Sequence, residues 1–234
     1  TNPGGNTILV PEEYASIQDA INVAVHGDEI IIGPGTYTGV GNWVINPMGK
    51  RLWIYSSDGP EVTIIDGEGL RCGIQCAGGE TSETILEGLT ITNGYATDGG
   101  GMYHYYSNPT LENCTFDSNV SNAGNEKDGG GGGMSNYSNS SPTLTNCLFT
   151  NNIADDDGEG PYGDGAGMYN DGSNPTLTDC TFDSNGWNLT AALGPVEGNC
   201  NEGGGMYNGN SSPTLTNCIF TNNYASDNAG GMFN

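Results

Sequence analysis

Five acidic side chains crowd one glycine-rich segment and are the first candidates for binding chemistry. They are Asp155, Asp156, Asp157, Glu159 and Asp164. Calcium takes roughly six to eight hard oxygen ligands, and carboxylates on a pliable loop can supply them. The segment lacks the twelfth-position glutamate and the flanking helices of an EF-hand. Two interpretations follow: an irregular calcium site, or a solvated acidic loop.

Basic residues, which could act as a base or hold an anionic polymer, are scarce. The chain has 28 acidic and 4 basic residues and a formal net charge of -24. The basic ones are Lys50, Arg51, Arg71 and Lys127. This charge disfavours nucleic acid, anionic membranes and polyuronates as partners. Arg51 and Arg71 are the candidates for the base of a lyase, while His26 and His104 lie in unrelated settings. We therefore expect a protein without catalytic residues and keep a polysaccharide lyase or glycoside hydrolase as the enzymatic alternative.

The seven cysteines favour buried thiols over a disulfide framework. Four share one place in a repeat: Cys114, Cys147, Cys180 and Cys218. If the repeats stack, these side chains point the same way, which does not suit a disulfide. Cys72 and Cys76 would lie on one strand about 13 Å apart, too far to pair. Cys200, in an insertion, is the cysteine most open to bridging, and no close C-x-x-C pair indicates zinc.

Asparagine and tyrosine side chains offer two further surface chemistries. Asn-x-Ser/Thr sequons predict possible glycosylation at Asn119, Asn136, Asn139, Asn188 and Asn210, whereas the sequon at Asn113 is expected to be a buried corner. A group of tyrosines follows the repeated methionines and could form an outward aromatic stripe able to bind sugars. Its members are Tyr103, Tyr105, Tyr106, Tyr137, Tyr169 and Tyr207.

A repeated unit positions all of these groups. The stretch GGGMYNGNSSPTLTNCIFTNN begins at Gly203, and close copies begin at Gly99, Gly131 and Gly165. A fifth copy opens at Gly230. Self-similarity at such a period marks a solenoid, in which one repeat cannot bury its apolar face alone.

The pattern of each repeat predicts short strands joined by sharp corners. Its apolar residues alternate, as in Cys114 and Phe116 around Thr115, which is the period of a strand. Between Leu111 and Cys114 the alternation breaks, so a corner falls at Asn113. Asn146, Asp179 and Asn217 occupy the same place in later copies. These residue types tolerate a left-handed backbone, and their side chains could bond from coil to coil.

The GG-M and C-x-F motifs make each copy resemble a coil of the right-handed parallel β-helix of the pectin-lyase-like superfamily. The motifs are also similar to the repeats of polymorphic outer-membrane adhesins. The resemblance implies an all-β right-handed parallel β-helix of about seven coils over residues 28–234, with regular repeats over 83–234. It leaves activity open, because this architecture hosts lyases, hydrolases, adhesins and inert fibres.

Residues 1–27 are expected to form an extended segment and an amphipathic capping helix. Apolar residues recur at helical spacing from Ile17 to Val25. Ser16 and Asp19 suggest a variant capping box, and Gly27 is expected to end the helix. Such a helix would cover the open end of the first coil.

The remaining expectations concern surfaces and partners. Insertions of variable length follow the phenylalanine of successive repeats and should share one face of the rod, where ligands often bind. The last repeat stops at GGMFN without a closing element, so its edge is expected to meet further repeats or another subunit. The assembly residues would be Ile8, Leu9, Val10, Gly231, Met232 and Phe233.

The sequence therefore predicts a secreted or cell-surface, non-catalytic β-helix that self-associates head to tail. A carbohydrate-binding or adhesin module is the alternative. Calcium is the one candidate cofactor. No apolar run approaches the roughly 20 residues of a membrane span.

Overall fold

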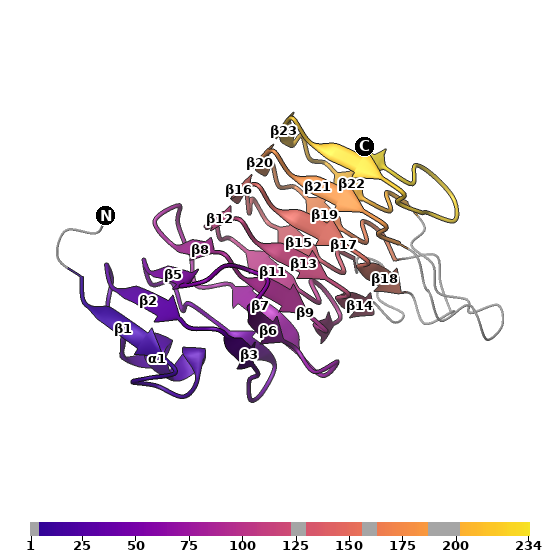
Figure 1. Cartoon of the computed structure of the whole chain (residues 1–234). Coiled ribbons are helices and arrows are strands. Elements are labelled where there is room, and N and C mark those ends of the chain that lie inside the picture. Colours follow the sequence, from indigo (N-terminus) through magenta and orange to yellow (C-terminus); the bar gives the residue numbers. More distant parts are fainter. Residues whose placement is uncertain (1–4, 123–129, 156–162, 187–201) are drawn as a thin grey trace.

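The repeated unit folds into coils of short strands, and the strands of successive coils pair in parallel. The computed structural model describes residues 5–122, 130–155, 163–186 and 202–234, and over these ranges the strands form three long parallel sheets and one short one. Figure 1 shows the coils stacked along one axis from the indigo N-terminal end to the yellow C-terminal end. This architecture is the expected all-β parallel β-helix.

Each long sheet takes one strand from each coil in turn. Sheet A contains β1 (Thr7–Val10), β2 (Glu29–Ile32), β5 (Trp53–Ser56), β8 (Ile85–Glu87), β12 (Thr110–Glu112), β16 (Thr143–Thr145), β20 (Thr176–Thr178) and β23 (Thr214–Thr216). Sheet B contains β3 (Gly35–Tyr37), β6 (Thr63–Asp66), β9 (Thr90–Thr92), β13 (Thr115–Asp117), β17 (Leu148–Thr150), β21 (Thr181–Asp183) and β24 (Ile219–Thr221). Sheet C contains β4 (Trp43–Ile45), β7 (Cys72–Cys76), β11 (Met102–Tyr105), β15 (Met134–Tyr137), β19 (Met168–Asp171), β22 (Met206–Gly209) and β25 (Met232–Phe233). The short sheet D contains β10 (Tyr95–Ala96), β14 (Val120–Asn122) and β18 (Ile153–Asp155).

Columns of like side chains fill the interior. Leucines of sheet A, phenylalanines of sheet B and methionines of sheet C each pair in register from coil to coil. The columns include Leu111, Leu144 and Leu177; Phe116, Phe149 and Phe182; and Met134, Met168 and Met206. All nine side chains are fully buried. The phenylalanine rings stack face to face with centroids 4.6 to 4.7 Å apart, so the aromatic column repeats at the strand spacing.

The repeated cysteines line up along the same axis. Each one immediately precedes a strand of sheet B, and those strands pair through Thr115, Leu148, Thr181 and Ile219. Cys114, Cys147 and Cys180 are buried and free, and Cys218 is free and half-buried. Buried free thiols are therefore confirmed for Cys114, Cys147 and Cys180, whereas Cys218 is a free thiol that is only partly buried.

The corner predicted after the leucine strand adopts the left-handed backbone that it requires. Asn113, Asn146, Asp179 and Asn217 have φ between 52° and 55°. Asn146 Nδ2 donates to Asn113 Oδ1 at 2.7 Å, and Asn217 Nδ2 donates to Asp179 Oδ1 at 3.1 Å, so the coil-to-coil bonding is partly realised. The expectation that Asn113 is buried is wrong, because the corner turns its side chain to solvent.

One helix packs against the first coils. α1 (Ile17–Val23) buries Ile17, Ala20 and Ile21, and it contacts β1, β2 and β4. Ser16 caps it by accepting a hydrogen bond from the Asp19 backbone N–H. The helix is shorter than predicted: Ala24 is already extended and Val25 is 59% exposed, so Gly27 does not end it.

The N-terminal assembly residues occupy a strand of the chain's own first sheet. Ile8, Leu9 and Val10 pair in parallel with Ile30, Ile31 and Ile32 of β2. Ile8 and Val10 are buried in the core. The prediction of an extended segment that adds to another subunit therefore needs correction over β1, because one of its edges pairs with β2 and the side chains of Ile8 and Val10 are buried, although Leu9 is exposed.

Candidate functional site

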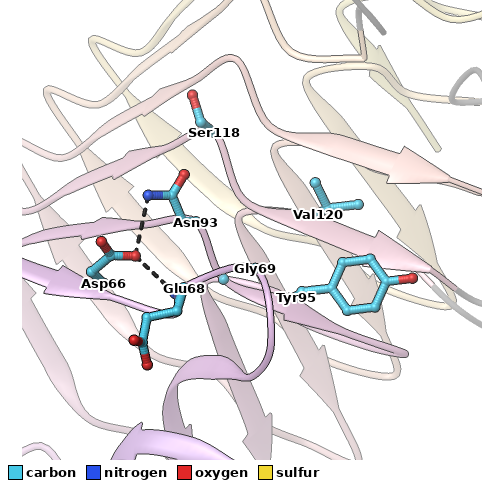
Figure 2. A pocket seen from close by; sticks show the side chains of 8 residues that line it. Asp66, Glu68, Gly69, Asn93, Tyr95, Ser118 and Val120 are labelled. Carbon is cyan, nitrogen blue, oxygen red and sulfur yellow. Dashed lines mark hydrogen bonds between the residues drawn. The ribbon is translucent and has the colours of Figure 1, made fainter. Parts of the chain in front are cut away.

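A groove of about 350 Å³ lies on the outside of the rod, where sheet B turns toward sheet D. Its polar lining comes from three successive coils: Asp66 and Glu68, then Asn93, then Ser118. Glu68, Asn93 and Ser118 have φ between 50° and 59°. Asn93 and Ser118 follow paired strands of sheet B, so the left-handed corner repeats at these two residues and turns their side chains outward. Glu68 lies one residue further along its own turn. Figure 2 shows the polar group together on one side, with the ring of Tyr95 extending away along the surface.

Hydrogen bonds hold the polar part of the groove in place. Asp66 Oδ1 accepts from Asn93 Nδ2 at 3.1 Å and from the Glu68 backbone N–H at 2.8 Å. Tyr95 is 41% exposed, and its hydroxyl oxygen accepts from Asn122 Nδ2 at 2.9 Å. A carboxylate, an amide and a half-exposed aromatic ring side by side form a surface that suits sugar hydroxyls and ring faces.

The basic residues that the structure describes have structural partners. Arg71 forms an ion pair with Glu68 and donates to Gly41 O, and Arg51 pairs with Glu83 at 3.3 Å. Lys50 Nζ donates to the carbonyls of Ile21 and Asn22 at the end of α1. Arg51 and Arg71 precede strands of different sheets, so the two candidate bases are not brought together.

His104 lies in the interior of sheet C and has one unused nitrogen. Asn136 Nδ2 donates to Asn170, so Asn136 Oδ1 accepts from His104 Nδ1 at 2.6 Å. This fixes the Nδ1–H tautomer and leaves Nε2 without a partner among the described residues. Burial lowers the pKa of His104 to about 4, and the ring is neutral at pH 7. The His26 side chain binds the main chain, because its Nδ1 accepts a hydrogen bond from the Arg51 backbone N–H.

The acidic cluster predicted to bind calcium is only partly within the described residues. Asp156, Asp157 and Glu159 lie outside them, and Asp155 is the last residue of β18. Asp164 is described, and its Oδ1 accepts a hydrogen bond from the Glu202 backbone N–H at 3.0 Å. Burial, followed by the charges of Glu202 and Asp227, raises the pKa of Asp164 to about 7. Within the described part of the chain no three His, Cys, Asp or Glu side chains are arranged to hold a metal ion.

The segments that flank the insertions occupy matching places in successive coils. Val120 of β14 pairs with Ile153 of β18 before two of the insertions. Gly130 and Asp164, which follow these two insertions, form a parallel bridge. Glu202 and Asn228, further along the chain, form another. The ends of the insertions thus lie along one edge of the rod, as the variable lengths predicted.

The tyrosine stripe exists as a stack but is not an open sugar platform. Tyr137 lies between Tyr103 and Tyr169, at 5.9 and 5.4 Å between centroids, in the coil where Ser135 replaces the tyrosine of the two neighbouring coils. Tyr169 is 7% exposed and stacks on Tyr207 at 5.0 Å. The Tyr137 hydroxyl donates to Asp98, and burial raises the pKa of Tyr137 well above its usual value. Only Tyr105 and Tyr106 of the predicted group are clearly exposed.

Two buried asparagine ladders are the features that sequence reasoning missed. In the first, Asn119, Asn152 and Asn185 each donate from Nδ2 to the Oδ1 of the next asparagine and to a main-chain carbonyl of the coil before. In the second, the same head-to-tail bonding joins Asn136, Asn170 and Asn208. The signal was the recurrence of asparagine three residues after the phenylalanine of each repeat and two residues after Met134, Met168, Met206 and Met232.

These ladders overturn part of the glycosylation prediction. Asn119 and Asn136 are fully buried, and their side-chain amides donate hydrogen bonds within the ladders. The folded chain therefore has no room for a glycan at either residue. Asn139 and Asn210 are exposed, so glycosylation there stays a prediction. Asn188 and Cys200 lie outside the described residues.

The thiols on β7 are inert by position. Cys72 and Cys76 are buried and unpaired with each other, as predicted. Burial raises the pKa of Cys72 to about 12, and Cys72 Sγ donates to the carbonyls of Ile74 and Gly99. A thiol that is protonated and enclosed at pH 7 is a poor nucleophile.

No helix among the described residues combines the length and apolar character needed to cross a bilayer.

Comparison with known proteins identifies the same architecture. A search of curated proteins found no match to this chain. The family model described as a right handed beta helix region matches residues 30–231, nearly the whole stack of coils. The chain therefore belongs to the right-handed β-helix family.

Proposed function

We propose that this chain is a non-catalytic structural β-helix, a building block of a cell-surface or extracellular assembly. The observation that carries the proposal is the register of its interior. Leucine, phenylalanine, methionine and asparagine columns run through successive coils without a change of place. Such a rod transmits load from coil to coil through main-chain bonds, stacked rings and amide ladders. The extracellular setting rests on the resemblance of the repeats to surface adhesins.

The charge and the basic side chains agree with a scaffold role. A net charge of -24 keeps rods soluble and apart except where a neutral or complementary surface meets another. The described arginines and Lys50 are committed to ion pairs and helix capping, and each holds the fold where it stands.

Association would occur at the strand edge made by β23, β24 and β25. Leu215, Phe220 and Met232 are only partly buried there, although their counterparts Leu177, Phe182 and Met206 are fully buried one coil earlier. Another coil placed on this edge, from this chain or a second one, would cover them. The opposite end carries α1, so we propose growth at the β23–β25 edge in place of a contact with a free N-terminal arm.

Light scattering and negative-stain microscopy of the purified chain test this proposal. We expect rods or fibres in the wild type and their loss in Phe220→Glu, which puts a charge on the edge. Tyr106→Glu is the matched control, because Tyr106 is 57% exposed and lies outside that edge. Monodisperse wild-type monomers at all concentrations would contradict the assembly role.

A carbohydrate-binding or adhesin module is the second candidate function, favoured by the groove of Asp66, Asn93 and Tyr95. Neutral glycans suit it, because the groove has two carboxylates and its nearby cation, Arg71, is paired with Glu68. A glycan array followed by calorimetry should show binding that Tyr95→Ala weakens and Tyr106→Ala does not. Release of reducing-end or unsaturated products from the bound glycan would favour a hydrolase or a lyase instead.

A further inference from the structure

The outer surface of sheet A becomes a threonine-only surface in its last three strands. β16, β20 and β23 each read Thr-Leu-Thr, with the leucine turned inward. The six outward residues, here called the threonine face, are Thr143, Thr145, Thr176, Thr178, Thr214 and Thr216. Five of the six are exposed and Thr178 is half-exposed.

The threonine face is a regular two-dimensional array. Thr143, Thr176 and Thr214 pair directly from strand to strand, and so do Thr145, Thr178 and Thr216. Paired strands lie about 4.8 Å apart, and alternate residues along a strand lie about 6.6 Å apart. Because threonine is β-branched and stiff at χ1, each coil repeats its hydroxyl and methyl group in a restricted orientation.

The hydroxyls of this array are free to bind an external partner. None of the six side-chain hydroxyls makes a hydrogen bond to another described residue, whereas the Thr110 hydroxyl, one coil earlier, donates to Ser82 O at 3.1 Å. The face is also uncharged on a chain of net charge -24. Its partner must therefore be neutral, flat and periodic in two directions, and able to both donate and accept hydrogen bonds.

The same three coils provide an internal contrast. On the outer surface of sheet B, the two columns that correspond to the threonine face are mixed. One runs Leu148, Thr181, Ile219 and the other Thr150, Asp183, Thr221. Charge and bulky side chains break the repeat there, so a periodic partner would fit sheet A and not sheet B.

We propose that the threonine face binds the surface of ice. Water oxygens on the faces of hexagonal ice repeat at spacings close to the two spacings of the array. Ordered water can therefore bridge the hydroxyls while the methyl groups fill the hollows between water molecules. A crystalline polysaccharide is the competing flat partner, and it is disfavoured because this face carries no aromatic ring on which sugar rings could stack.

Slow growth of an ice hemisphere in a solution of the fluorescently labelled chain tests the proposal, with inhibition of ice recrystallisation as a second readout. We expect the wild type to enter the ice and to slow recrystallisation. Thr176→Tyr places a bulky ring in the middle strand and should weaken both effects roughly tenfold. Thr181→Tyr, in the same coil but on sheet B, should leave both unchanged.

Thermal unfolding and circular dichroism of both variants verify that they fold, so that a loss reflects the face itself. The proposal is overturned if the wild type is excluded from ice as an inert protein is, or if both variants lose activity equally. Binding to crystalline cellulose or chitin that Thr176→Tyr abolishes, without binding to ice, would also overturn it and assign the face to polysaccharide.

Discussion

The first coils and the last coils bury their interiors by different means. In the first, the inward positions are mainly aliphatic, as in Ile30, Ile54, Ile65 and Ile74. In the last, each position repeats one residue type, and two of the columns are buried asparagines. Aliphatic burial is tolerant of small shifts, whereas a buried amide that loses its partner costs free energy. The comparison teaches that the last coils specify register with polar groups, while the first coils rely on apolar burial.

The largest effect is expected where a glycine lets two of the last coils approach closely. A Cβ added at Gly167 would lie 2.4 Å from Gly205 O and 2.9 Å from the Phe182 ring. Gly167→Ala should therefore cost about 3 kcal/mol of unfolding free energy or prevent folding. Urea unfolding measures it. Gly209→Ala is the control, since the nearest atom there is 3.2 Å away on the Tyr207 ring, and equal losses would refute the close-approach argument.

Breaking the buried ladder should cost nearly as much. Asn152→Ala removes the acceptor of one Asn119 side-chain N–H and of the Asn119 backbone N–H, and the amide donor to the Phe116 carbonyl, so we expect a loss of about 3 kcal/mol. Asn146→Gly removes an exposed ladder amide of the same coil and keeps the left-handed backbone, so its cost should stay below about 1 kcal/mol. Similar losses for the two variants, by chemical denaturation, would show that burial does not distinguish the ladders.

The boundary between the two regions should respond to pH. His104 is buried neutral with a pKa of about 4, against 6.5 in the unfolded chain, so protons bind the unfolded state preferentially between these values. Stability should fall by about 3 kcal/mol as pH drops from 6.5 through 4. The raised pKa of Asp164 acts oppositely, because its ionisation destabilises the fold as pH rises from 3.8 through about 7.

His104→Asn isolates the histidine effect. The new amide would extend the Asn136 ladder by one coil, and the Asp164 contribution cancels when the two proteins are compared. We expect the wild type to lose stability relative to the variant on acidification. Parallel stability curves from pH 7 to pH 4 would contradict the assignment.

The smallest effect is expected at the surface of the first coils. Arg51 and Glu83 form an exposed pair, so Arg51→Ala should change the unfolding free energy by about 0.5 kcal/mol or less. Denaturation at low and high salt measures it. A loss well beyond this would contradict the assignment of a weak, solvent-screened pair, because the backbone N–H that Arg51 donates to His26 is kept in the variant.

The sequence repeat predicted the β-helix architecture because each repeat forms one coil. The columns of Cys114 and Phe116 and the left-handed corner at Asn113 followed from alternation and its single break. Which asparagines are buried and which are exposed did not follow from this pattern. Asn119 and Asn113 read alike in sequence, yet one lies inside the rod and the other outside, and only the turn geometry decides between them. The groove was also hidden, because Asp66, Asn93 and Ser118 come together only across three coils.

The amides of both interior ladders run in the same direction, and this gives the rod an electrical polarity. Within each ladder, Nδ2 donates to the Oδ1 of the asparagine in the following coil, and Oδ1 accepts from the coil before. The side-chain dipoles therefore add along the axis, as peptide dipoles do in a helix. Whatever coil comes next along this axis has to offer oxygen atoms at two fixed places, so the stack can discriminate among its neighbours by chemistry as well as by shape.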